Sequence, residues 1–204
     1  MLLHNPGRDE FRRRFCEALL ARRVLITEGK TEYDSFPAAA RRLHELHPDE
    51  FKTLEAMGIA IINAETDSQI DPLGTFYRGL GKIVFAVFDK QSLSRKVEIE
   101  AAVDYPFEAP EKGFENVILN GTNESALRRY AISLVLSSEW PSHLSLKIPS
   151  VSMSLEDIKD ALRDYLRWAK GVGSAADLLG QCTKEEMPSF IVEVLELIQT
   201  MIDF

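Results

Sequence analysis

The chain has 204 residues, of which 45% are hydrophobic and 27% are charged, and its formal net charge is −8. This composition supplies enough apolar material for one large globular domain or two small ones. The acidic balance excludes a protein that coats duplex DNA by its own charge, because that binding needs lysine and arginine to displace counterions. It does not exclude an enzyme that acts on DNA through bound cations.

The sequence gives no sign of a membrane or export segment. No stretch approaches the roughly 18 consecutive apolar residues of a membrane span, and the N-terminus lacks the charged-then-apolar plan of a signal peptide. Cys16 and Cys182 lie far apart and lack metal-binding spacing, so we interpret both as thiols in a reducing compartment. We therefore expect a cytoplasmic protein with no membrane partner.

The first half of the chain alternates between strand and helix patterns. A helix is expected over 8–22, a buried strand over 23–29, a helix over 32–46 and a second strand over 57–64. A helix then ends near Gly79 or Gly81, a third strand follows over 82–90, and a shorter fourth strand is expected near 100–110. This order predicts parallel strands joined by right-handed crossovers, and hence an α/β fold.

The pattern changes near residue 121. Helices are expected over 123–139, 154–170, 174–182 and 187–203, with a loop or short extended segment between Pro141 and Pro149. The sequence therefore predicts an N-terminal helix and an α/β domain over 1–120, followed by a mainly helical subdomain over 121–204.

Two of the predicted strands end in an acidic residue. Glu28 ends the first and Asp89 ends the third, while Glu32 follows Glu28 by one helical turn. The carboxyl ends of parallel strands meet at one edge of a sheet, which is where open α/β sheets bind their ligands. Three carboxylates at one edge repel each other unless a positive charge lies among them, and a hard divalent cation is the natural occupant.

These segments carry a family resemblance. The stretch "VLITEGKTEYDSFPAAARRL", followed by "GIAIINA" and "GKIVFAVFD", resembles a Toprim domain. It is most similar to that of the overcoming lysogenization defect (OLD) family of nucleases, which opens with an apolar strand and an E-G-x-T-E type turn. The resemblance implies a Rossmann-like parallel sheet flanked by helices and covers roughly residues 10–204.

The resemblance also implies site residues. Where the family has a D-x-D type pair, this chain has Asp89 and Gln91, so the second position offers an oxygen without a negative charge. Glu115 matches an acidic position ahead of the helical region, and Lys170 matches a lysine near the C-terminus of OLD proteins. The implied activity is a DNA endonuclease using two Mg²⁺ or Mn²⁺ ions, held by Glu28, Glu32 and Asp89 with help from Gln91 and Glu115. Lys170 is then expected to neutralise charge on the phosphate in the transition state.

OLD proteins normally carry an ATPase domain before the Toprim domain. This chain contains no G-x-x-x-x-G-K-[ST] phosphate loop, because "GLGK" at 79–82 is too short and is followed by Ile83. We therefore expect the chain to be a C-terminal nuclease region that does not hydrolyse ATP, with the N-terminal ATPase domain absent here.

Each site residue also has a simpler interpretation. Glu28 and Glu32 could stabilise a helix N-terminus through its dipole, and Asp89 could cap the following helix. Gln91 could be a surface side chain, Glu115 a solvated loop acid, and Lys170 a helix-ending lysine before Gly171.

Two other functions stay open from the sequence. The chain could be another Toprim enzyme, such as a primase, a topoisomerase or an RNA-processing nuclease, although no tyrosine is marked as a nucleophile. It could also be a degenerate Toprim fold kept as a non-catalytic interaction module, which Gln91 would permit. A dinucleotide-binding domain is less favoured because no G-x-G-x-x-G follows the first strand.

Overall fold

The structure is a computed structural model that describes residues 15–169 and 173–202. Its centre is a four-stranded parallel sheet in the order β2-β1-β3-β4. The strands are β1 (Arg23–Thr27), β2 (Ile59–Asn63), β3 (Ile83–Phe88) and β4 (Tyr105–Glu108). The predicted α/β class, the parallel pairing and the short fourth strand are therefore confirmed.

Helices α2 (Lys30–Leu46), α3 (Ile70–Gly79) and α4 (Leu93–Ala102) connect successive strands. A short 3-10 helix, η1 (Asp67–Gln69), precedes α3. Helix α4 was not predicted, because its apolar positions are few and it buries only Ile99 and Ala102. The N-terminal helix predicted over 8–22 falls partly outside the described residues, and residues 15–20 are helical.

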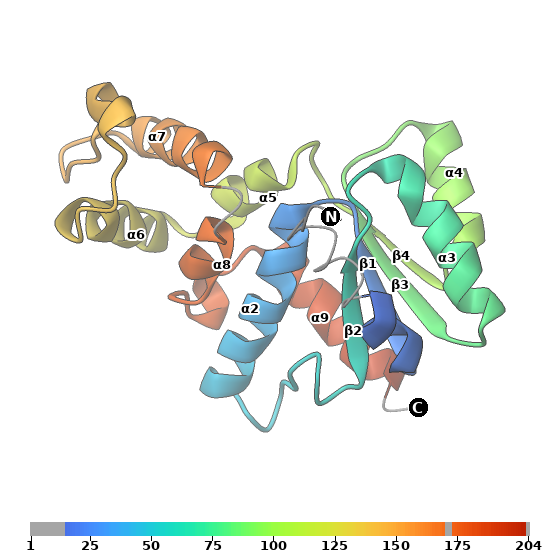
Figure 1. Cartoon of the computed structure of the whole chain (residues 1–204). Helices are drawn as coiled ribbons and strands as arrows, with labels where there is room; N and C mark the ends of the chain where they lie inside the picture. Colours follow the sequence, from blue (N-terminus) through green and yellow to red (C-terminus); the bar gives the residue numbers. More distant parts are fainter. Residues whose placement is uncertain (1–14, 170–172, 203–204) are drawn as a thin grey trace, which may run out of the picture.

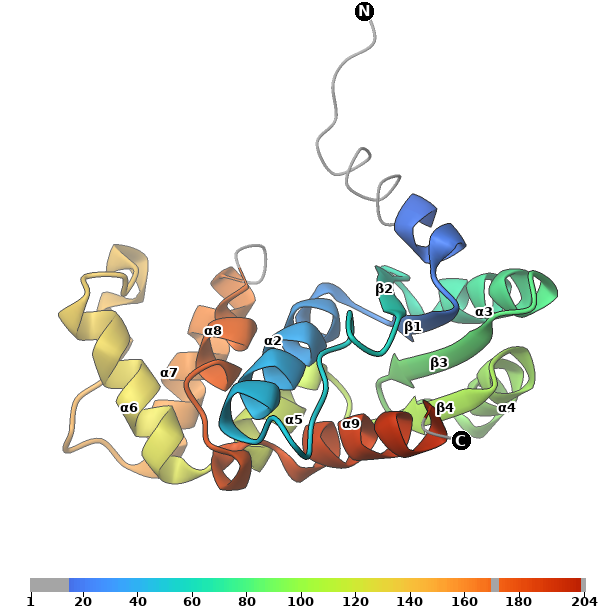
Figure 2. The ribbon, with the colours of Figure 1, turned by 90° about the horizontal axis from the view of Figure 1, so that it is seen from below.

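Alternate residues of each strand enter two different hydrophobic layers. On β1, Leu25 packs with α2 and α9 (Ser189–Ile202), whereas Val24 and Ile26 pack with α3 and α4. Figure 1 shows α3 and α4 on one side of the sheet and α2 on the other, and Figure 2 shows α9 lying below the sheet on the α2 side. Both faces are therefore covered, which explains why the strands are continuous apolar runs.

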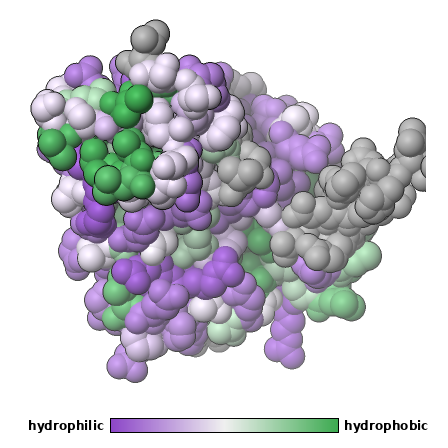
Figure 3. Space-filling view, turned by 60° about the vertical axis from the view of Figure 1, so that its left-hand side comes forward, coloured by the Kyte–Doolittle hydropathy of each residue, from purple (hydrophilic) through white to green (hydrophobic). Residues whose placement is uncertain are grey.

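The remaining described residues are helical or irregular. The helices are α5 (Phe114–Gly121), α6 (Glu124–Leu136), α7 (Leu155–Trp168) and α8 (Ser174–Leu179), with 3-10 turns η2 (Ser142–Lys147) and η4 (Lys184–Glu186). Helix α5 was not predicted. Figure 3 shows a mostly hydrophilic or intermediate surface on the side of the molecule that bears α6 and α7, with hydrophobic side chains gathered at its upper left and smaller groups lower down.

The largest hydrophobic cluster runs from the sheet into these helices. It joins Phe85 of β3 to Ile118 of α5, Leu162 of α7 and Ile198 of α9. The division into units at residues 120 and 121 stays a prediction, since this core is continuous across it. Within the described residues, no helix has both the length and the apolar character needed to cross a membrane.

Candidate active site at the carboxyl edge of the sheet

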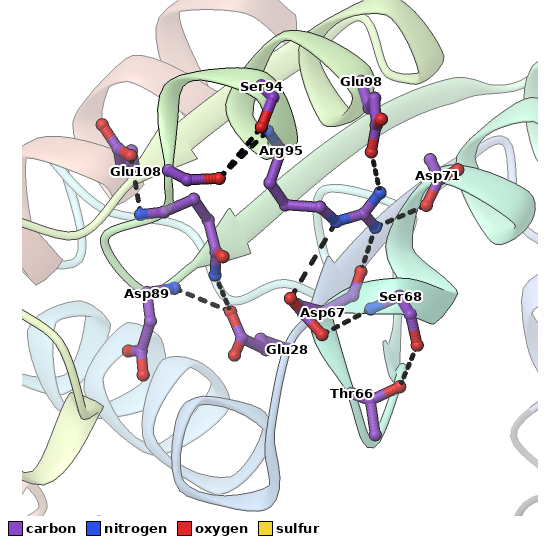
Figure 4. A network of polar contacts seen from close by, with 12 residues as sticks. Glu28, Thr66, Asp67, Ser68, Asp71, Asp89, Ser94, Arg95, Glu98 and Glu108 are labelled. Carbon is purple, nitrogen blue, oxygen red and sulfur yellow. Dashed lines mark hydrogen bonds and ion pairs between the residues drawn. The ribbon is translucent and has the colours of Figure 1, made fainter.

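Glu28 lies where β1 ends, and it links that strand to the end of β3. Its backbone N–H donates to the carbonyl of Val87 at 3.1 Å, which extends the β1–β3 pairing by one residue. Its carboxylate Oε2 accepts from the backbone N–H of Asp89 and from Nε2 of Gln91, both at 3.0 Å. Figure 4 shows Glu28 and Asp89 side by side at this edge. The predicted meeting of these two strand ends is thus present.

The surroundings of the Glu28 carboxyl group disfavour its negatively charged form. Partial burial raises its pKa, and the carboxylates of Asp89 and Asp67 raise it further. The hydrogen bonds from Asp89 and Gln91 oppose this shift, because they stabilise the charged form. The balance is a raised pKa in the absence of a cation.

Glu32 is the most deeply buried acid of the group. It lies in the first turn of α2 with only 3% of its surface exposed. Burial raises its pKa to about 8, and the charges of Asp89, Glu28 and Glu115 act in the same direction. A backbone hydrogen bond at its own position in the helix opposes the shift. The helix-dipole interpretation therefore accounts for part of its environment but does not explain its burial among three other acids.

Gly29 leaves the space into which the Glu32 side chain folds. A Cβ atom at position 29 would lie 3.0 Å from Oε2 of Glu32. A larger residue would push this carboxylate aside, which gives a physical reason for glycine between the two glutamates of the turn.

Asp89 joins the strand ends to the start of α5. Its Oδ2 accepts from the backbone N–H of Gly113 at 2.7 Å, and Gly113 has φ +83, a conformation that favours glycine. Asp89 does not cap the following helix, because the cap of α4 is Ser92, whose hydroxyl accepts from the N–H of Arg95. The capping interpretation of Asp89 is therefore wrong.

Glu115 reaches the same edge from α5. Its Oε1 accepts from the hydroxyl of Thr31 at 2.7 Å, a contact across 84 positions of the chain. Glu115 lies in the first turn of α5 and is partly buried, so it is not a solvated loop acid. Lys170 lies outside the described residues, and its predicted role stays a prediction.

Two acids at this edge were missed by the sequence reasoning. Glu108 ends β4, and its carboxylate accepts from the N–H of Gln91 at 3.0 Å and from Nζ of Lys96 at 2.7 Å. Lys96 and the Gln91 N–H lower the pKa of Glu108. The rule that identified Glu28 and Asp89, an acid at a strand end, applies equally to Glu108.

Asp67 is the second missed acid. It lies in η1 after β2, close enough to Glu28 to raise the pKa of that group. Arg95 from α4 holds this segment by donating to the Asp67 carbonyl and to the carboxylate of Asp71 (Figure 4). No strand-end pattern marks Asp67 in the sequence, because three residues separate it from the end of β2.

The donor set fits a hard divalent cation in its chemistry. All candidate ligands are oxygen donors, and burial of mutually repelling carboxylates is relieved by a positive charge. Within residues 15–169 and 173–202, however, no three His, Cys, Asp or Glu side chains are already arranged as an ion-binding group. Gln91, Gly113 and Thr31 each donate a hydrogen bond to one oxygen of Glu28, Asp89 and Glu115, respectively.

Comparison with known proteins identifies a family whose domain covers the strands that precede Glu28 and Asp89. Residues 19–90 match the family model described as "Overcoming lysogenization defect protein-like, TOPRIM domain". No curated protein matches the chain significantly.

Solved structures match over most of the chain. The C-terminal region of the Burkholderia pseudomallei OLD protein has a TM-score of 0.60 at 18% identity, covering 90% of this chain and 99% of that one. The C-terminal region of the Xanthomonas campestris pv. campestris OLD protein phased with platinum has a TM-score of 0.63 at 18% identity, covering 92% and 96%. The same region phased with iodine has a TM-score of 0.64 at 18% identity, covering 90% and 97%. At this level of identity, the likeness concerns the fold.

Proposed function

Because residues 19–90 form an OLD-like Toprim domain in a chain folded like the C-terminal region of OLD proteins, we propose that the protein is a metal-dependent DNA endonuclease. The observation that carries the proposal is the convergence of Glu28, Glu32 and Asp89 at the carboxyl edge of the sheet. The hydrogen bond from Asp89 to Glu28 and the raised pKa of Glu32 both support it.

The proposed ligands are Glu28, Glu32 and Asp89, supplemented by Gln91 and Glu115. Two Mg²⁺ or Mn²⁺ ions held there would activate a water molecule and stabilise the attacking and leaving oxygens of a phosphodiester. Glu32 would lose its proton on loading, because its raised pKa keeps it protonated at neutral pH without a nearby cation. The Gln91 amide would have to flip to present its oxygen, since its nitrogen now faces Glu28.

Lys170 is proposed as the cation that stabilises charge on the phosphate. Two described residues on either side of Lys170 in the sequence supply the support for this proposal. Leu166 and Gly173 line one small cavity, of about 10 Å³, together with Thr31 and Glu115.

The test is nicking of supercoiled plasmid with Mn²⁺ or Mg²⁺, with and without EDTA and ATP. We expect cutting that requires the metal and not ATP. Glu28→Ala and Asp89→Ala should each nearly abolish it, because a two-metal mechanism fails when either ion is misplaced. Lys170→Ala should slow cutting by about 10²-fold with unchanged Mn²⁺ affinity. Full activity in both Glu28→Ala and Asp89→Ala would end the assignment of these residues.

One contact favours a second candidate function, a non-catalytic interaction module. The Gln91 amide satisfies a Glu28 oxygen at 3.0 Å and so reduces the need for a cation. Mn²⁺ titration by calorimetry separates the two, because a module would keep the fold and bind little metal.

A further inference from the structure

The cations that lie near the candidate site are not distributed evenly over the surface. Lys159, Arg163 and Arg167 follow one another at intervals of four along α7, so they share one face of this helix over a length of about 12 Å. A neighbouring face of α7 is buried, with Ile158, Leu162 and Leu166 in the core. The basic face is therefore turned away from the core.

A chain of contacts links this face to the active-site edge. Lys159 Nζ contacts Asn120 Oδ1 at 3.4 Å, and Arg163 Nε donates to Asn116 Oδ1 at 3.2 Å. Asn116 Nδ2 donates in turn to the carbonyl of Lys112 at 2.9 Å. Lys112 immediately precedes Gly113, whose N–H binds Asp89.

Lys90 extends the same surface into the site. Its backbone N–H donates to the carbonyl of Glu111 at 3.2 Å, which places the Asp89–Gln91 turn beside the loop that carries Lys112. We use the name basic track for Lys90, Lys112, Lys159, Arg163 and Arg167.

Most residues of the basic track carry a positive charge that no ion pair neutralises. Lys90, Lys112 and Arg167 are exposed, and within the described part of the chain neither they nor Lys159 form an ion pair. Four acids moderate this charge: Glu156 and Asp160 lie on the same face of α7, where Asp160 pairs with Arg163, Glu111 bonds Asn120 at 2.9 Å, and Glu108 feels the charge of Lys90. Many other cations in the structure are neutralised, such as Arg129 by Glu186 and Lys147 by Asp164.

We propose that the basic track binds the phosphate backbone of duplex DNA and guides it to the carboxyl edge of the sheet; this rests on the proposed nuclease function. A chain of net charge −8 repels a polyanion overall, so its binding needs a local surface of unpaired cations. Contacts of lysine and arginine with phosphates carry no base recognition, so the track provides binding without sequence preference.

The test compares two double variants that each remove two positive charges. Lys159→Gln with Arg167→Gln alters the track, and Arg22→Gln with Arg41→Gln is the control. Arg22 and Arg41 are exposed, form no ion pair within the described residues, and lie on the sheet side of the molecule at β1 and α2. Binding of a fluorescein-labelled duplex is measured by anisotropy in EDTA over a range of NaCl concentrations, so that no cutting occurs.

The track double variant should bind about tenfold more weakly at low salt, and the slope of log K against log[salt] should fall by up to about 2, since each lost phosphate contact removes about 0.9. The control should bind within twofold of the wild type. Lys112→Gln provides a third variant with little risk to folding, because only the backbone carbonyl of Lys112 makes a described hydrogen bond. It should weaken binding about threefold.

The proposal that the basic track binds DNA would be overturned if the two double variants weakened DNA binding equally, or if neither weakened it. If the wild type still nicks plasmid with Mn²⁺ in that case, the nuclease proposal stands without it. A wild type that neither binds nor nicks DNA would overturn both proposals.

Discussion

At the scale of single residues, the site is defined by carboxylates that are held close together by hydrogen bonds. Glu28 accepts two of these bonds. Glu32 is buried, and the charged groups that shift its pKa are the acids Asp89, Glu28 and Glu115. Burial raises the pKa of both groups, and for Glu32, at about 8, it favours the neutral form until a cation replaces the proton. We therefore expect the stability of the protein to fall as pH rises and to increase when a metal ion binds.

Glu32→Gln should change how stability depends on pH in metal-free protein. The folded pKa of Glu32 is about 8 against an ordinary value of 4.5, so between these pH values the native state holds a proton that the unfolded state has released. Wild-type stability should consequently fall as pH rises from about 4.5 to 8, by up to about 1.4 kcal/mol per pH unit. Glu32→Gln lacks this titration and should lose that part of the slope. Urea unfolding in EDTA between pH 5 and 8 measures it, and parallel curves for the two proteins would contradict the expectation.

Gln91→Asp should lower the stability of the metal-free protein and raise its affinity for Mn²⁺. The change removes the amide that donates to Glu28 and adds a carboxylate to a group of like charges, so the metal-free protein should melt at a lower temperature. Mn²⁺ should bind about tenfold more tightly, equivalent to about 1.4 kcal/mol. Calorimetric titration provides the affinity, and Gln91→Asn is the control because it shortens the side chain equally without adding charge. Equal Mn²⁺ affinity in the two variants would show that a negative charge at position 91 does not contribute to binding the ion.

At the scale of elements, the position of the site depends on how closely α3 and α4 pack on one face of the sheet. Gly74 of α3 lies against the end of α4: an added Cβ would come within 2.8 Å of both the Ala102 carbonyl oxygen and Val103 Cγ1. Near the other end of α4, Arg95 donates to the Asp67 carbonyl and to the Asp71 carboxylate, and so holds η1 beside Glu28.

Gly74→Ala should destabilise the protein by about 1–3 kcal/mol, because the backbone of α4 would have to move away from α3. The matched control is Gly79→Ala in the same helix, where an added Cβ meets nothing within 4 Å. That control should leave stability unchanged or raise it by up to about 1 kcal/mol, since alanine is the better helix former. Urea unfolding of both variants compares them directly, and equal losses of stability would show that the close contact at Gly74 is not the cause.

At the scale of the whole molecule, the sheet and the C-terminal helices form one connected core. Phe36 of α2 contacts Phe114 of α5, which contacts Phe190 of α9, with ring centroids 5.9 and 6.3 Å apart. Binding an ion at the sheet edge should therefore stabilise the chain as a unit and not only its loops.

Mn²⁺ should raise the melting temperature of the whole chain in one transition. At a concentration 100 times its Kd, an ion that binds only the native state adds about 2.7 kcal/mol. For a chain of 204 residues, each kcal/mol corresponds to about 2–4 °C, so a rise of about 5–10 °C is expected. Asp89→Asn should lose most of it, whereas Glu156→Gln, at an exposed residue of α7, should retain it. An unchanged melting curve at millimolar Mn²⁺ would count against an ion at this edge.

The sequence by itself determined the parallel sheet and the place of its acids. Strands buried on both faces are continuous apolar runs, and an acid that ends such a run must lie at the sheet edge; this pattern is local and visible in "VLITEG" and "VFD". For the same reason the positions of Glu28 and Asp89 were predictable, and that of Glu32 followed from its place one helical turn after Glu28. Helices α4 and α5 were not, because each is short and only part of its surface is buried.

Only the tertiary structure decided what these acids contact. The bond of Thr31 to Glu115, the turn at Gly113 that meets Asp89, and the alignment of the α7 cations with α5 all join residues far apart in sequence. Contacts of this kind depend on the crossovers and on packing against a shared core, which no local pattern of residues encodes. The raised pKa of Glu32 has the same origin, since burial of its carboxyl group requires α2 to be packed against the sheet.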